Sequence, residues 1–234
     1  MSQIPSDHRA ATADAARDVE RARAIALQHG WNAMAYQVVN SGIQHWFSQA
    51  GDAVTGYVRT HGTCIVVGAP ICAGDRLDSV LGEWETFADS IGCRSCYFGA
   101  AGRVFDLLHT RAGYTTVVLG AQPTWDPATW HEIPARTASL RSQMHRARNK
   151  GVQVSEWNPE RAESDPRLRI CLEQWLSTRG LPTLHFLVEP HTLDDLRGRR
   201  LFVAERGAGI VGFITASPVP ARNGWLVEQF VRGS

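Results

Sequence analysis

The sequence has no long apolar run and no strong excess of charge of one sign. Its least polar stretch, residues 62–74, is shorter than the roughly 20 residues that cross a bilayer as a helix, so we expect no membrane span. Lys and Arg together number 24 and Asp and Glu number 23, which gives a formal net charge of +1. Because so small a charge creates no global field, a polyanionic partner would have to meet a local basic patch.

The signatures of several enzyme classes are missing as well. There is no G-x-S-x-G and no P-loop, and "HEIPA" lacks the second histidine of H-E-x-x-H, which argues against hydrolases and nucleotide enzymes of those kinds. The N-terminal segment has no apolar stretch behind a basic end, so we expect a cytoplasmic protein without a secretory signal.

The five cysteines are an odd number and indicate reduced thiols. Cys93 and Cys96 have the C-x-x-C spacing of half a zinc site or of a redox pair, but no second pair completes it. We therefore expect buried structural thiols and no metal site.

A glycine motif, "ERGAGIVGF", places Gly207, Gly209 and Gly212 in the G-x-G-x-x-G spacing of dinucleotide-binding folds. That motif binds a dinucleotide only where a helix begins at the last glycine. Here β-branched residues follow, interrupted by Pro218 and Pro220, so no helix is expected. Strand, glycine turn and strand instead predict a β-hairpin in which Gly207 and Gly209 adopt positive φ.

The order of the expected elements predicts an α/β fold in two related modules. Residues 1–30 have the pattern of an amphipathic helix, and after it strands alternate with helices, ending in the strand "YTTVVLGA". The proline-rich sequence around residues 123–134 predicts a boundary between two modules. We therefore expect an N-terminal helix at 1–30, a first module at 31–125 and a second at 126–234.

Two hairpins support this division. The segments "YVRTHGTCIVVGAPI" and "FVAERGAGIVGFITA" share one plan, which indicates an internal duplication. The second module holds about half the elements of the first, so we expect it to be incomplete. Ending on "GWLVEQFV" leaves an apolar sheet edge, which predicts pairing with a second copy and a homodimer.

A basic segment, "PARTASLRSQMHRARNKG", contains no acidic residue. On a helix Arg141, His145 and Arg148 share a face, and a cationic face of this kind suits a nucleotide or an RNA backbone. A solvated helix surface is the alternative, and the residues leave both open.

A second group of polar residues gathers towards the C-terminus: His185, Glu189, His191, Arg222, Asn223 and Glu228. His185 or Glu228 could act as a general base for an attacking amine or hydroxyl. His185 has apolar neighbours, so a core histidine is the alternative. Glu228 alternates with apolar residues on a strand and would need a partner there, for which Arg222 is the expected residue.

Several of these stretches together resemble the C-terminal domain of the phosphatidylglycerol lysyltransferase family: "SLRSQMHRARNKGVQVSEW", "CLEQWLSTRGLP", "LHFLVEP" and "RRLFVAERGAGIVGFITASPVPARNGWLVEQFVRG". The resemblance extends from about residue 30 to the end. It implies two tandem GNAT-like acyltransferase modules with mixed sheets. It also implies transfer of an aminoacyl group from aminoacyl-tRNA to a lipid head group or another hydroxyl or amine acceptor, with no metal and no cofactor beyond that co-substrate.

The resemblance also implies roles for particular residues. Those at the tRNA acceptor end would be Arg141, His145, Arg146, Arg148 and Lys150. Arg222, Asn223 and Glu228 would lie near the substrate cleft. From the residues themselves we take Glu228 and His185 as the candidate catalytic residues. The membrane-spanning part of the best-known members is missing, which allows a soluble acceptor or a lipid reached peripherally from the membrane surface. An acyl-CoA-dependent N-acyltransferase and a non-catalytic RNA- or partner-binding module are the alternatives.

Overall fold

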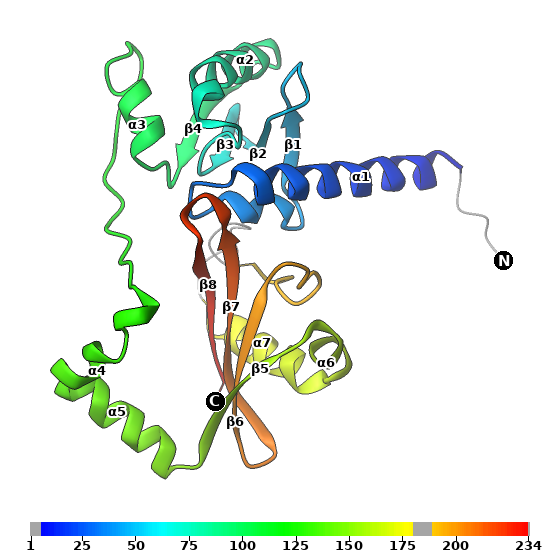
Figure 1. The fold of residues 1–234 in the computed structure, drawn as a ribbon. Coiled ribbons are helices and arrows are strands. Elements are labelled where there is room, and N and C mark those ends of the chain that lie inside the picture. The colour runs from blue at the N-terminus through cyan, green and yellow to red at the C-terminus, as the bar shows by residue number, and fades with distance from the viewer. Residues whose placement is uncertain (1–5, 180–188, 234) are drawn as a thin grey trace. The chain divides into compact units, whose positions relative to one another are not determined.

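The structure, a computed structural model, describes residues 6–179 and 189–233 and contains two four-stranded sheets (Figure 1). Their strand orders are β1-β2-β3-β4 and β5-β6-β7-β8. The chain divides into two compact units. Of the described residues, the first unit holds 6–115, 189–199 and 216–228, and the second holds the rest. This confirms a mixed α/β fold, while the module boundaries expected after residues 30 and 125 stay predictions.

The first unit contains the first sheet. Its elements are α1 (Ser6–His29), η1 (Ala35–Val39), β1 (Gln44–Phe47), β2 (Val54–Thr60), β3 (Thr63–Val67), η2 (Gly74–Arg76), α2 (Leu77–Ser90), β4 (Arg94–Phe98) and α3 (Gly102–Leu108). Strands β1, β2 and β3 are antiparallel, and β4 lies parallel to β3 after the α2 crossover. Helix α2 forms because apolar residues recur at helical spacing, and Val80, Leu81 and Trp84 are fully buried.

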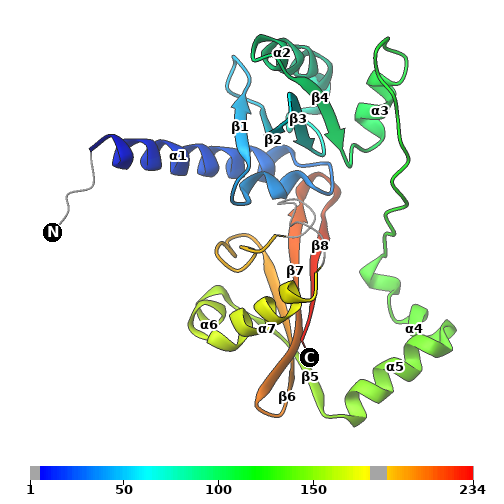
Figure 2. The same cartoon turned by 180° about the vertical axis from the view of Figure 1, so that it is seen from behind.

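The second unit continues the chain after residue 115. The elements from there to the C-terminus are η3 (Pro127–Thr129), α4 (Glu132–Arg136), α5 (Ala138–Asn149), β5 (Val152–Trp157), α6 (Pro159–Ser164), α7 (Pro166–Ser177), β6 (Arg200–Arg206), β7 (Gly209–Val219), η4 (Pro220–Arg222) and β8 (Gly224–Arg232). Of these, η4 belongs to the first unit, and β7 and β8 each have residues in both units. Helices α6 and α7 lie against one face of the second sheet (Figure 2). Asn158 and Asp165 cap their N-termini, each followed by a proline at the first helical position.

The glycine motif forms a hairpin between β6 and β7, as predicted. Gly207 has φ +58° in the turn, whereas Gly209 has no positive φ, so the expectation for that glycine was wrong. Gly212 is required for another reason: a Cβ there would lie 2.6 Å from the carbonyl oxygen of Val231 on β8. The motif therefore serves strand packing, since a β-strand follows its last glycine.

Two expectations were wrong. Residues 114–121 form no strand, and Val117, Val118 and Leu119 are 76%, 87% and 67% exposed. A β-branched run becomes a strand only where a neighbouring strand pairs with it, and within the described ranges none does.

The thiol of Cys93 is buried as expected, but Cys96 on β4 is exposed.

Strand β8 ends the second sheet and is an edge strand, with Phe230 64% exposed. Pairing of a second copy along this edge stays a prediction. Among the described residues, no helix combines the length and apolar character needed to cross a membrane.

Candidate functional site

A buried ion pair inside the first unit joins two of the segments that the sequence singled out. Arg199, directly before β6, places its Nε 3.1 Å from Oε2 of Glu228 on β8. Both side chains are 3% exposed. The same Nε also donates a hydrogen bond of 3.1 Å to Oγ of Ser217 on β7. Glu228 therefore pairs with Arg199, and the expected pairing with Arg222 was wrong.

The rest of the Arg199 guanidinium is bonded as well. Its Nη1 donates to the carbonyl oxygen of Asp195 at 2.8 Å, and its Nη2 donates to Oδ1 of Asn40 at 2.5 Å. The guanidinium carbon lies 5.2 Å from the centre of the Tyr36 ring. A buried charge is tolerated only when its donors are paired, and Arg199 meets that condition. It ties η1, the segment 189–199, the end of β7 and the middle of β8 into one structure.

A second arginine extends this network to the N-terminal helix. Arg23 on α1 is buried, and its Nη1 donates to the Tyr36 hydroxyl at 2.7 Å while its Nη2 contacts Oδ2 of Asp195 at 2.5 Å. The Tyr36 hydroxyl in turn donates to the carbonyl oxygen of Arg197 at 2.7 Å. We call Arg23, Tyr36, Asp195, Arg199 and Glu228 the arginine network.

Within the arginine network, the carboxyl group of Asp195 has a pKa well below its usual value. Burial by itself raises its pKa, but hydrogen bonds from the Arg197 side chain and backbone and the charge of Arg23 outweigh burial and bring the pKa down to about 2. Asp195 is therefore ionised at neutral pH and holds two arginines in place.

The second carboxylate oxygen of Glu228 has a different environment. Oε1 is buried and has no hydrogen-bond partner among the described residues. An acceptor left unpaired in a low-dielectric site carries a free-energy cost, which a donor from a water or a substrate would remove. The carboxylate thus offers one oxygen to Arg199 and keeps one lone-pair site for a further N–H or O–H group.

The other predicted residues of this group lie differently. Arg222 and Asn223 are exposed in the turn between β7 and β8, where Asn223 adopts the left-handed conformation. Their side chains are therefore in contact with solvent, whereas the Glu228 side chain is buried. His185 lies outside the described residues. Of the predicted catalytic and substrate-binding residues that the structure describes, Glu228 alone belongs to the arginine network.

The cationic helix α5 lies in the second unit and has no buried residue. His145, Arg146, Arg148 and Lys150 are exposed on it or at its end, and no acidic residue occurs between residues 133 and 155. Arg141 is also exposed, but its Nη1 donates to the carbonyl oxygens of Pro134 and Ala135 at 3.0 and 2.9 Å. It therefore holds α4 against α5, and Arg146, Arg148 and Lys150 form the free cationic surface, with the exposed His145 beside them.

Sequence reasoning did not find most of the arginine network. Arg23 and Asp195 carry no motif, and neither do Asn40 and Ser217, which accept hydrogen bonds from Arg199; the hydrogen-bond partners of these residues are up to 174 residues away in the chain. The one local signal is the Arg199–Arg200 doublet before an alternating strand. Nothing in that doublet indicates that Arg199 is buried whereas Arg200 lies near the surface, paired with Glu156.

Groups of His, Cys, Asp and Glu side chains hold metal ions in proteins. Within residues 6–179 and 189–233, no three side chains of His, Cys, Asp or Glu gather as a metal-binding group. The arrangement instead offers hydrogen-bond acceptors, fixed cations and an exposed basic surface.

Comparison with known proteins gives a family match. The model of the family described as "Phosphatidylglycerol lysyltransferase, C-terminal" matches residues 22–232. A search of curated proteins finds no match.

Solved structures share the fold. One is a C-terminal domain (DUF2156) assigned to a lysylphosphatidylglycerol synthetase of Agrobacterium fabrum, with TM-score 0.80 and 17% identity over 94% of this chain and 69% of that one. Another is L-PGS from Bacillus licheniformis, with TM-score 0.71 and 19% identity over 92% of this chain and 66% of that one. A conserved protein of unknown function from Bacteroides thetaiotaomicron has TM-score 0.60 and 15% identity, over 87% and 73% of the two chains.

Proposed function

The chain belongs to the phosphatidylglycerol lysyltransferase C-terminal family, and from this we propose that it transfers an aminoacyl group from aminoacyl-tRNA to a lipid head group. The family match over residues 22–232 is the observation that carries the proposal. The chain spans about two thirds of the length of the first two similar structures. That it has the activity of a whole relative is therefore part of this proposal.

Helix α5 supports the tRNA part. Phosphates bind where several cations are exposed and no carboxylate competes, which describes His145, Arg146, Arg148 and Lys150. Arg141 fixes α5, which carries these four residues, to α4. We propose that the four contact the tRNA acceptor end. An interaction of this kind weakens steeply with salt, because bound counterions are released from the RNA.

The chemical step is an ester exchange. A hydroxyl of the acceptor attacks the aminoacyl carbonyl carbon, a new C–O bond forms, and the bond to the tRNA ribose breaks. The proton of the attacking hydroxyl ends on the departing ribose oxygen, so the step needs no oxidant or metal. Positioning of the two substrates and backbone N–H groups that stabilise the oxyanion supply most of the acceleration in such reactions.

Glu228 is our candidate catalytic carboxylate. The unpartnered Oε1 supports this role, because it can accept a hydrogen bond from the acceptor hydroxyl or from the ammonium group of the aminoacyl ester. Arg199 would act through Glu228 as a positioning residue. Arg222 and Asn223, exposed at the start of β8, are proposed to contact the acceptor, and His185 is kept as a second catalytic candidate.

We also propose that each sheet forms one acyltransferase module of the GNAT kind. Each sheet has four strands, and the first includes a parallel pair joined by a helical crossover.

A transfer assay tests the proposal. The chain is mixed with tRNA bearing a radiolabelled amino acid and with phosphatidylglycerol vesicles, and the lipid fraction is counted. Label in the lipid that disappears with Glu228→Gln supports the proposal. Transfer of acetyl from labelled acetyl-CoA, with no lipid labelling from aminoacyl-tRNA, would contradict it and favour the N-acyltransferase alternative.

A further inference from the structure

Two exposed tryptophans precede the cationic helix. Trp125 is 55% exposed and Trp130 is 42% exposed. Their ring centroids lie 6.2 Å apart with an interplanar angle of 87°, an edge-to-face arrangement. The ring that presents its edge keeps both of its faces uncovered by its partner. We call these two residues the tryptophan pair.

The pair is presented by a hydrogen-bonded turn. Asp126 accepts a hydrogen bond of 2.9 Å from the backbone N–H of Ala128, which caps the short helix η3. The backbone N–H of Trp130 donates to the carbonyl oxygen of Pro127 at 3.3 Å. The two indoles are therefore held at a defined spacing, although the chain just before them has no regular structure.

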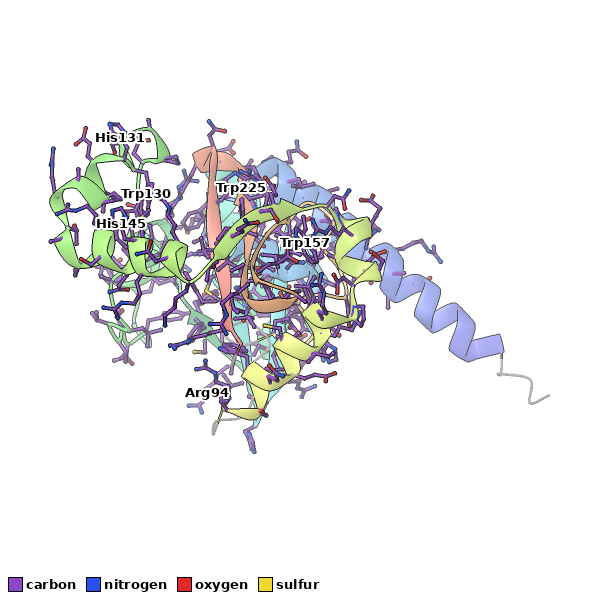
Figure 3. All side chains as sticks on the ribbon, turned by 90° about the horizontal axis from the view of Figure 1, so that it is seen from below. Arg94, Trp130, His131, His145, Trp157 and Trp225 are labelled. Carbon is purple, nitrogen blue, oxygen red and sulfur yellow. The ribbon has the colours of Figure 1, made fainter. Side chains whose placement is uncertain are left out.

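The turn continues directly into α4 and then into the basic helix α5. The backbone N–H of Ile133 donates to the carbonyl oxygen of Trp130 at 3.1 Å, and Arg141 then joins α5 to α4. Figure 3 labels Trp130, His131 and His145, which all come from this segment. The tryptophan pair and the cations thus belong to one local structure, residues 125–150.

We infer that the tryptophan pair stacks on unpaired nucleotides of an RNA whose phosphates contact α5. Proteins that bind single strands combine a cationic surface along the backbone with aromatic rings on which bases stack, and this segment has both. The identity of the RNA rests on the proposed function: the unpaired 3′ end of tRNA, which carries the aminoacyl group. Cations alone do not distinguish paired from unpaired RNA, so the pair supplies that selectivity.

A bilayer surface is the competing partner for basic residues near tryptophans, and the environment of α5 argues against it. A helix that lies on a membrane exposes an apolar face to the lipid. The apolar residues Leu140, Met144 and Ala147 on one side of α5 are partly buried, and most of its remaining residues are exposed and polar. The helix therefore presents cations, which matches a polyanion.

Fluorescence anisotropy with two labelled RNAs tests the inference. One is uncharged tRNA with its unpaired 3′ nucleotides, and the other is the same tRNA with those nucleotides removed. The wild-type chain is expected to bind the first RNA about tenfold or more tightly than the second, as base stacking on aromatic rings predicts. In the Trp125→Ala/Trp130→Ala variant this preference falls below about twofold, while affinity for the trimmed RNA is unchanged.

Two variants serve as controls. Trp125→Phe/Trp130→Phe keeps aromatic faces and retains most of the preference, which excludes misfolding as the cause. Phe105→Ala removes another exposed aromatic, which is stacked on His109 at 4.8 Å in the first unit, and leaves the preference intact.

Three outcomes would overturn the inference. They are equal affinity of the wild-type chain for both RNAs, an undiminished preference in the double alanine variant, and an equal loss of affinity for both RNAs. Phosphatidylglycerol vesicles are tested in parallel by co-sedimentation. Loss of vesicle binding with RNA preference intact would assign the pair to a membrane surface instead.

The result is independent of the transfer assay. A chain that selects the tailed RNA through its tryptophans but transfers no aminoacyl group contradicts only the proposed function. A chain that labels lipid but ignores substitution of the pair contradicts only this inference.

Discussion

Arg199 and Glu228 form an ion pair with an N–O distance of 3.1 Å, and both side chains are almost fully buried within a single unit. Arg200, the next residue, pairs with Glu156 at 2.8 Å, but those side chains are 43% and 45% exposed. Two adjacent arginines thus make the same kind of contact in opposite environments.

This contrast predicts different costs of substitution. Arg199→Ala leaves a buried unpaired carboxylate and should lower the free energy of unfolding by about 3–5 kcal/mol. Arg200→Ala removes an exposed pair and should cost at most about 1 kcal/mol. Urea denaturation of both variants measures the difference, and equal costs would show that Arg199 is not buried as described.

The shifted pKa of Asp195 predicts a loss of stability in acid. The pKa in the folded chain, about 2, lies below the usual 3.8, so the contribution of this carboxylate is complete above about pH 4 and is lost as pH falls towards 2. The contribution is of the order of 2 kcal/mol. Unfolding free energies measured from pH 5 to pH 2 should fall less steeply in Asp195→Asn, and parallel curves would contradict the prediction.

The three glycines of the G-x-G-x-x-G motif should respond differently to alanine. Gly212→Ala forces a Cβ against the carbonyl oxygen of Val231 and should cost about 1–3 kcal/mol. Gly207→Ala should cost about 1 kcal/mol, because its φ is positive. Gly209→Ala meets no close atom and serves as the matched control. Thermal melts rank the three, and a large cost at Gly209 would contradict the hairpin geometry.

The cations of α5 should determine the salt dependence of tRNA binding. Replacing Arg146, Arg148 or Lys150 by Ala should weaken binding and reduce the slope of log K against log salt by about one unit each. Arg94→Ala, which removes an exposed cation from β4 in the other unit, should leave the slope unchanged. Filter binding across a salt series measures both, and equal slopes in all variants would remove α5 from the RNA surface.

Only one thiol should react rapidly in the folded chain. Cys96 is exposed, while the other four cysteines are buried, and burial raises the pKa of Cys72 to about 11. A thiol reagent at pH 8 should titrate one group quickly and five after denaturation, and Cys96→Ser should abolish the fast phase. Two or more fast thiols would contradict the burial of the other four cysteines, three of which lie in the first unit and one, Cys171, in the second.

The sequence predicted local features well. The glycine hairpin, the N-terminal helix and the alternation of strands with helices in the first unit all formed, because turn chemistry and apolar periodicity act within a few residues. The strand expected at 114–121 did not form, because strand formation also needs a partner. Arg222 was expected beside Glu228 because it is near in sequence, whereas the actual partner is 29 residues away.

By itself the sequence determined the family, the helices, the hairpins and the acid-free basic surface, because each depends on residues that are close together in the chain. Only the tertiary structure decided that Arg199 meets Glu228, and that Asn40, 159 residues away, completes its hydrogen bonds. The physical reason is desolvation: a guanidinium can be buried only where packing of distant segments supplies a partner for its donors, and no local pattern records which segments those are.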